Sequence, residues 1–93
     1  MDVSVQDSPE QHRFVVLVDG DPRGFAAYRE RDSAVVITHS EVDPELRGQG
    51  VGQELARRTL DLVRERGDRV VAQCPFFARY IGEHPEYADL LEG

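Results

Sequence analysis

The sequence predicts an α/β fold, in which a twisted, mostly antiparallel sheet carries one long helix and one short C-terminal helix. Three observations lead to this prediction. Three segments rich in valine follow one another with short polar breaks, the hydrophobic period becomes helical at Val51, and a further valine-rich segment follows the helix. The length of 93 residues is enough for one domain.

The first half of the chain predicts a flexible start followed by an antiparallel meander. Residues 1–10 are polar and contain Pro9, so we expect a flexible N-terminus and a domain that occupies residues 11–93; a short extended stretch within residues 1–10 is the alternative. The valine-rich segments predict three strands, over residues 12–19, 25–30 and 34–42. Because the breaks between them are short and dense in turn residues, we expect neighbouring strands to pair antiparallel.

The second half predicts a helix, a strand and two short helical segments. Apolar residues recur at helical spacing, namely Val51, Leu55, Ala56, Leu60 and Val63. They predict a helix over residues 50–66, with Gly67 just past its end. The fourth strand is expected over 69–73 and parallel to the third, because a strand, a helix and a strand form a right-handed crossover. A short helix over 76–81 and a final helical turn over 86–91 complete the prediction.

Composition excludes several classes of function. The net charge of −7 argues against a nucleic-acid partner, which requires a basic surface. The chain has no lysine, which excludes a P-loop and a Schiff-base enzyme. The longest apolar run, residues 14–18, is too short to span a membrane, and no signal peptide precedes it, so we expect a cytoplasmic protein. The single cysteine predicts neither a disulfide nor a metal site.

Three alternating glycines stand between the third strand and the long helix, in Arg47-Gly48-Gln49-Gly50-Val51-Gly52. The start of a helix leaves backbone N–H groups unpaired and carries a partial positive charge, so it attracts phosphate. Glycine lets a ligand approach these amides, and the Arg47 guanidinium suits phosphate oxygens. The segment therefore indicates a pyrophosphate site built mostly from main chain. The alternative is a tight turn without a ligand.

At this segment the chain resembles the GNAT superfamily of N-acetyltransferases, whose coenzyme A signature reads Arg/Gln-x-x-Gly-x-Gly/Ala. Arg47, Gly50 and Gly52 match that signature. The stretches 39–46, 74–81 and 84–87 are similar to the small, single-domain (YidJ-type) branch of the superfamily.

The resemblance implies a minimal GNAT fold that binds acetyl-CoA. It implies that the backbone of residues 47–52 holds the pyrophosphate, and that the pantetheine arm lies between the third and fourth strands. The acetyl thioester would then end near residues 39–42 and residue 74, so Val42 and Cys74 are expected beside the coenzyme. Larger members carry a further strand and two helices before the meander, and we expect no counterpart of them here. The acceptor pocket would therefore be open, completed by a partner subunit, or absent.

Acetyl transfer to an amine needs a base for the amine proton and an acid for the leaving thiolate. Alternation in the third strand places His39 and Glu41 on the face that also carries Val35 and Ile37, so either is a candidate base. The alternatives are a solvated carboxylate and a half-buried histidine whose ring has its hydrogen bonds.

Two further residues are candidates near the fourth strand. Cys74 is a candidate for a transient acetyl-cysteine, with its thiol activated by His39 or His84; the alternative is simple packing beside the ligand. Tyr80 is a candidate acid toward the coenzyme A thiolate, or else a core aromatic.

The function that we expect is transfer of an acetyl group from acetyl-CoA to a primary amine, on a small molecule or a protein. Two alternatives remain open, a non-catalytic module that binds acyl-CoA and a structural interaction domain without a ligand. A homodimer is a further expectation, because a domain this small gains from association.

Overall fold

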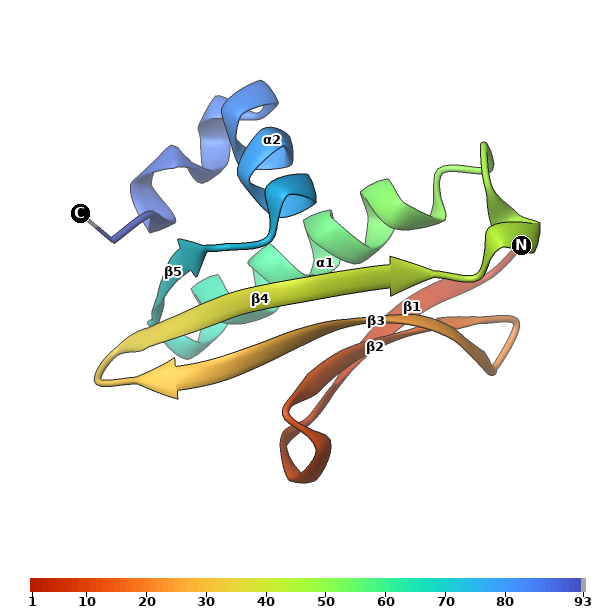
Figure 1. Ribbon diagram of the computed structural model, residues 1–93, viewed down its shortest axis with the longest axis horizontal. Coiled ribbons are helices and arrows are strands. Elements are labelled where there is room, and N and C mark those ends of the chain that lie inside the picture. Colours follow the sequence, from red (N-terminus) through yellow and green to blue (C-terminus); the bar gives the residue numbers. More distant parts are fainter. Residues whose placement is uncertain (93) are drawn as a thin grey trace.

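The computed structural model describes residues 1–92 as a five-stranded mixed sheet with the strand order β1-β2-β3-β4-β5 (Figure 1). The strands are β1 (Val3–Ser8), β2 (Arg13–Val18), β3 (Asp21–Arg31), β4 (Ala34–Val42) and β5 (Arg69–Ala72). The helices are α1 (Val51–Arg66) and α2 (Pro75–Glu83), with short 3-10 helices at Pro9–Gln11, Pro44–Leu46 and Pro85–Leu90. β1 to β4 are antiparallel neighbours, and β4 and β5 are parallel. The predicted fold class is therefore confirmed.

The N-terminus differs from the prediction. The predicted flexible residues form β1, an edge strand paired along its length with β2, so the expectation that no strand precedes the meander is wrong. Val3 and Val5 turn inward and pack against the core, while Ser4 and Gln6 are exposed. The predicted domain limits of 11–93 are thus too narrow at the start, and at the other end they include Gly93, which lies outside the described residues.

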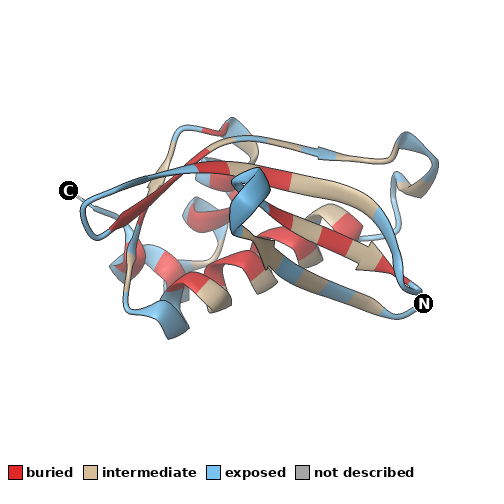
Figure 2. Ribbon diagram, turned by 90° about the horizontal axis from the view of Figure 1, so that it is seen from below, coloured by how far each residue is buried: buried red, intermediate tan, exposed pale blue. Residues whose placement is uncertain are grey.

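One core lies between the sheet and the helices. α1 turns its buried residues toward the sheet, which Figure 2 shows as a row of buried positions along one side of the helix. α2 packs beside α1 and contributes Phe77, Tyr80 and Ile81 to the same core. We call the helix-covered face of the sheet the inner face and the opposite one the outer face. Neither helix among residues 1–92 is long and apolar enough to cross a membrane.

A β-bulge in β4 reverses the expected alternation of its side chains. Ile37 pairs with Tyr28 of β3, but His39 pairs with the adjacent Ala27, so Thr38 is an extra residue on β4. The Thr38 hydroxyl donates a hydrogen bond to the Ala27 carbonyl oxygen at 3.3 Å. Because one extra residue moves every later side chain to the other face, the prediction that His39 and Glu41 share a face with Ile37 is wrong.

Beyond the bulge, the inner face carries Ser40 and Val42, and the outer face carries His39 and Glu41. Ser40 pairs with Ala26, a fully buried core residue, and Val42 packs against the core. His39 and Glu41 are exposed. The bulge therefore separates the two candidate bases from the residues that face α1.

Candidate coenzyme site

The strands β4 and β5 separate at the point where α1 begins to cover them. The pairing of β4 with β5 ends at Ile37 and Ala72, and β4 continues to Val42 paired with β3 on one side only. The backbone N–H groups of Gln73 and Cys74 both donate to the Ile37 carbonyl oxygen, at 3.0 and 2.9 Å, which turns the chain away from β4. The result is a gap between the two strands, as the resemblance implied.

A hollow of about 230 Å³ lies beside this gap. Its lining comes from the end of β4, the start of α1 and the start of α2: Ser40, Glu41, Val42, Gly52, Leu55 and Phe76. The Phe76 ring lies so close to Gly52 that a Cβ there would be 3.4 Å from the ring. The hollow is therefore mostly apolar and suits the uncharged arm of a ligand whose phosphates lie at the helix start.

The start of α1 presents unpaired backbone amides. No side chain caps this helix, and its N-cap residue Gly50 has a φ of 81°. Within residues 1–92, the N–H groups of Gly48 and of residues 50–53 make no hydrogen bond, whereas those of Arg47 and Gln49 donate to the Pro44 and Leu46 carbonyl oxygens. The free amides therefore differ from the predicted range of residues 47–52. The amides of Arg47 and Gln49 are not free, and the amide of Gln53 is free in addition.

The space in front of these amides is open. A Cβ built on Gly48 or on Gly50 would meet no atom within 4 Å, and both residues have positive φ, which glycine adopts without strain. The Arg47 side chain is exposed, and no carboxylate of the described part of the chain pairs with it. An anion can therefore reach the amides and the guanidinium together.

Cys74 and Ser40 face each other across the gap. Cys74 is buried, 3% exposed, and its Sγ lies 3.2 Å from the Ser40 Oγ. The predicted activation by a histidine is not found, because His39 contacts Glu41 and His84 contacts the Tyr80 carbonyl oxygen. Ser40 is thus the polar neighbour of the thiol, and the sequence prediction missed it because the bulge turns it inward.

The two candidate bases lie together on the outer face at the end of β4. His39 Nε2 is 2.8 Å from Glu41 Oε2, and both side chains are more than half exposed, at 61% and 64%. Glu41 also lines the coenzyme hollow, so it lies where the two faces of the sheet meet. The structure therefore brings His39 and Glu41 together, but on the face opposite to Cys74.

Tyr80 lies at the contact between α1 and α2. It is 4% exposed and its ring stacks on that of His84 with 3.8 Å between centroids. Burial raises the pKa of Tyr80, which the nearby Arg57 lowers in part. The hydroxyl is therefore protonated at neutral pH, as an acid must be.

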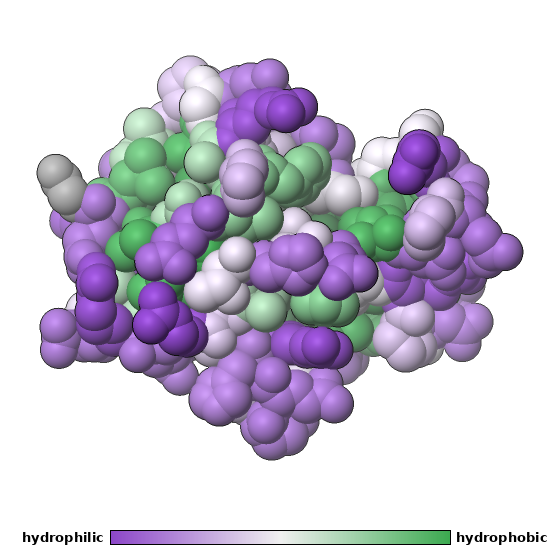
Figure 3. Space-filling view, in the orientation of Figure 1, coloured by the Kyte–Doolittle hydropathy of each residue, from purple (hydrophilic) through white to green (hydrophobic). Residues whose placement is uncertain are grey.

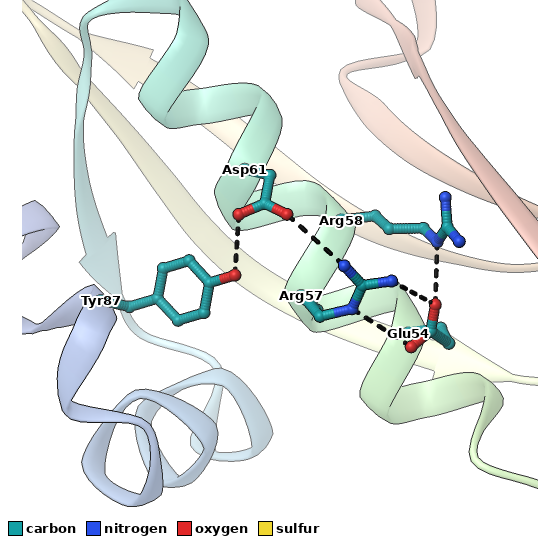
Figure 4. Close-up of polar contacts among 5 residues, drawn as sticks. All are labelled: Glu54, Arg57, Arg58, Asp61 and Tyr87. Carbon is teal, nitrogen blue, oxygen red and sulfur yellow. Dashed lines mark hydrogen bonds and ion pairs between the residues drawn. The ribbon is translucent and has the colours of Figure 1, made fainter.

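A polar network ties the C-terminal segment to α1 (Figure 4). Its Tyr87 ring lies 6.1 Å from the Tyr80 ring, measured between centroids. The Tyr87 hydroxyl donates to Asp61 at 2.7 Å, and Arg57 lies 3.8 Å from the same carboxylate. Arg57 and Arg58 both donate to Glu54, which holds the pKa of Glu54 below its usual range. Since the charges are mutually compensated, this network holds α1 in place rather than offering a free charge to a ligand.

Comparison with known proteins supports the same interpretation. The family model described as GCN5-related N-acetyl-transferase matches residues 13–90. A GCN5-like putative N-acetyltransferase from Staphylococcus aureus, solved by NMR, has 25% identity and a TM-score of 0.71, with 97% of this chain and 88% of that chain covered.

Two curated proteins extend the comparison. Human protein NATD1 is 27% identical over 94 residues, which cover 97% of this chain and 83% of NATD1. Streptothricin acetyltransferase from Streptomyces lavendulae is 39% identical over 64 residues, which cover 67% of this chain but 34% of that protein, so the chain spans about a third of its length. With the family match, the strand gap and the uncapped glycine-rich helix start in agreement, the chain belongs to the GCN5-related N-acetyltransferase family.

Proposed function

We propose that this protein transfers an acetyl group from acetyl-CoA to a primary amine, and that it belongs to the small, single-domain branch of its family. The observation that carries the proposal is the set of free amides at residues 50–53, which open on empty space beside an apolar hollow. NATD1 supports the assignment to a small branch, because the match covers 97% of this chain and 83% of NATD1.

The residues present fit the coenzyme in three ways. The amides at the start of α1 and the Arg47 guanidinium would bind the pyrophosphate. The unpaired edge of β4 beyond Ile37 offers backbone groups to the amides of the pantetheine arm. The apolar hollow between Val42 and Phe76 excludes water from that arm. Bound in this way, acetyl-CoA would supply an activated acetyl group at the strand gap.

The reaction that we propose is direct attack by the amine, with Glu41 as the base and His39 as its partner. The contact of 2.8 Å between them orients the carboxylate at the end of β4. Tyr80 is our candidate for the acid, because burial keeps its phenol protonated.

An acetylated Cys74 is the alternative route, which the contact with Ser40 across the gap supports. In it the acetyl group passes from the coenzyme sulfur to Sγ of Cys74, and the amine then displaces Cys74. Mass spectrometry of the intact protein after mixing with acetyl-CoA distinguishes the routes: direct attack predicts an unchanged mass, and the covalent route predicts one added acetyl group that Cys74→Ala abolishes.

Thermal melting tests the coenzyme site itself. Acetyl-CoA at a hundred times its dissociation constant should raise the free energy of unfolding by about 2.7 kcal/mol. For a domain of this size we expect the melting temperature to rise on the order of 10 °C. An equal concentration of pyrophosphate-free S-acetylpantetheine should shift it far less. No shift with acetyl-CoA would contradict the proposal.

A non-catalytic module that binds acyl-CoA is the second candidate, supported by the open form of the two hollows that Glu41 lines. It predicts the same thermal shift but no release of free thiol when primary amines are added. Amine-dependent thiol release therefore separates the enzyme from the binding module.

A further inference from the structure

β1 leaves one edge of the sheet without a partner strand. It stands at the end of the strand order and pairs with β2 alone, from Val3 to Ser8 and without a register shift. The Asp19 N–H donates to the Asp2 carbonyl oxygen at 2.8 Å, so the main-chain groups of Asp2 point toward β2. Because these groups alternate between the two sides of a strand, those of Val3 and Val5 point away from β2, where no strand of residues 1–92 lies.

The residues of β1 do not protect this edge against a further strand. Exposed edges in natural proteins commonly carry a proline, a lysine, a bulge or an inward charge. Residues 3–6 have none of these, and the carboxylate of the following Asp7 accepts a hydrogen bond from the Tyr28 hydroxyl at 2.7 Å. The backbone of β1 is therefore available to pair with a second extended segment.

A hollow of about 250 Å³ lies beside the same edge. Ser4 and Val5 of β1 line one side of it, and five residues of α1 line the other: Arg57, Arg58, Asp61, Leu62 and Glu65. The charged groups of this lining are two arginines and two carboxylates, whereas the whole chain has a net charge of −7. The hollow is thus a locally neutral part of an acidic protein, where two copies can approach each other without strong repulsion.

Three of these α1 residues form a stripe that is complementary to itself. Arg58, Leu62 and Glu65 are spaced by four and by three residues, so they lie on one side of the helix. Arg58 donates to Glu54 through Nε at 2.9 Å, which leaves its terminal nitrogens for another carboxylate. Glu65 is exposed and forms no ion pair within residues 1–92. A two-fold axis beside Leu62 would bring Arg58 of each copy to Glu65 of the other.

We propose that two copies of this chain associate through β1, so that their sheets join into one and their α1 helices meet along this stripe. One two-fold axis serves both contacts, because the hollow brings Ser4 and Val5 together with the middle of the stripe. When the axis passes through Ser4, Val3 of one copy stands opposite Val5 of the other, and such β-branched pairs stabilise a sheet.

The association leaves the proposed coenzyme site open. The free amides at residues 50–53 begin about two helical turns before Arg58, and the gap between β4 and β5 lies at the other end of the strand order from β1. The side of the molecule that carries β4, where Figure 3 shows polar side chains spread among hydrophobic areas, is likewise outside the interface. The association is therefore independent of acetyl-CoA binding, and the second copy does not complete the acceptor pocket.

Sedimentation equilibrium of the full chain tests the association, and we expect a mass of twice 10.5 kDa at high protein concentration. Glu65→Arg places two arginines together at each contact, and Arg58→Glu places two carboxylates together. Each variant alone should therefore dimerise at least about tenfold more weakly. An equimolar mixture of the two variants should dimerise again, because a mixed pair has opposite charges at both contacts. Glu83→Arg, the matched control on the exposed end of α2, should leave the dimer unchanged.

Amide hydrogen exchange locates the contact on β1. The N–H groups of Val3 and Val5 should exchange slowly in the dimer and rapidly in Glu65→Arg, whereas those of Ser4 and Gln6, which point toward β2, should stay protected in both. Four outcomes would overturn the proposal. These are a mass of 10.5 kDa at every concentration, a dimer that withstands Glu65→Arg, a mixture of the two charge variants that stays monomeric, and rapid exchange at Val3 and Val5 in the dimer.

Discussion

Replacing Gly50 by alanine tests the amide site with a control built into the same helix. Gly50 stands at the start of α1 with a φ of 81°, and Gly67 stands just past its end with a φ of 78°. A Cβ on either residue would meet no atom within 4 Å. Both substitutions should therefore lower the free energy of unfolding by the same amount, about 1 kcal/mol, from the left-handed backbone alone.

The two variants should differ in their affinity for acetyl-CoA. The methyl group of Gly50→Ala enters the open space in front of the free amides, and one lost hydrogen bond to a charged phosphate amounts to about 1.5–3 kcal/mol. The dissociation constant should therefore rise at least about tenfold, whereas Gly67→Ala should leave it unchanged. Urea unfolding measures the stability and titration calorimetry the affinity. The amide site would be refuted if both variants lost the same affinity for acetyl-CoA, or if neither variant lost any.

The pyrophosphate is the specific target of this argument. S-acetylpantetheine lacks it, so Gly50→Ala should bind that fragment as the unmodified protein does. If the variant lost affinity for the fragment as well, the methyl group would be acting on the pantetheine hollow or on the fold, and not on phosphate binding.

Two further predictions concern stability. Burial and the Asp7 carboxylate raise the pKa of Tyr28 to about 12, so between pH 10 and 12 the folded protein keeps a proton that the unfolded chain loses. The free energy of unfolding should fall over that range by about 3 kcal/mol, and Tyr28→Phe, followed by urea unfolding at each pH, should remove this fall. Tyr87→Phe removes the hydrogen bond to Asp61 and should cost about 1 kcal/mol in urea unfolding at pH 7, while Asp61→Asn, which keeps an acceptor, should cost less. A Tyr28→Phe variant with the original alkaline slope, or a Tyr87→Phe variant of unchanged stability, would contradict the respective contact.

The elements with strong local patterns could be predicted from the sequence. β4 has the predicted bounds, and α1 begins one residue later than predicted, because β-branched runs and helical spacing act over neighbouring residues. β1 could not be predicted with the same certainty. Val3 and Val5 alone give only a weak alternation of apolar and polar residues. β1 forms because it pairs with the free edge of β2, and the residues of β1 do not reveal that this edge is available.

The unpaired amides at the start of α1 could be predicted, because glycines between a strand and a helix indicate an uncapped helix start; that these amides bind a coenzyme stays a prediction. The surroundings of Cys74 could not be predicted from the sequence. Ser40 of β4 contacts Cys74, which precedes α2, and it faces the thiol only because of the shift between Ala27 and Tyr28 in the pairing of β3 with β4. Such a shift depends on how two strands fit together, and neither strand shows it alone.

The bulge at Thr38 has a chemical consequence that follows from geometry. Without the extra residue, His39 and Glu41 would face α1 and share the buried side with the coenzyme, and Ser40 and Val42 would face solvent. The carboxylate would then have to lose its water to enter an apolar hollow, which is costly for a charged group. With the bulge, the hollow keeps small and apolar side chains for the donor, and the charged base stays in contact with solvent on the face that an ammonium ion can reach. The single inserted residue therefore assigns the two faces of one strand to the two halves of the proposed reaction.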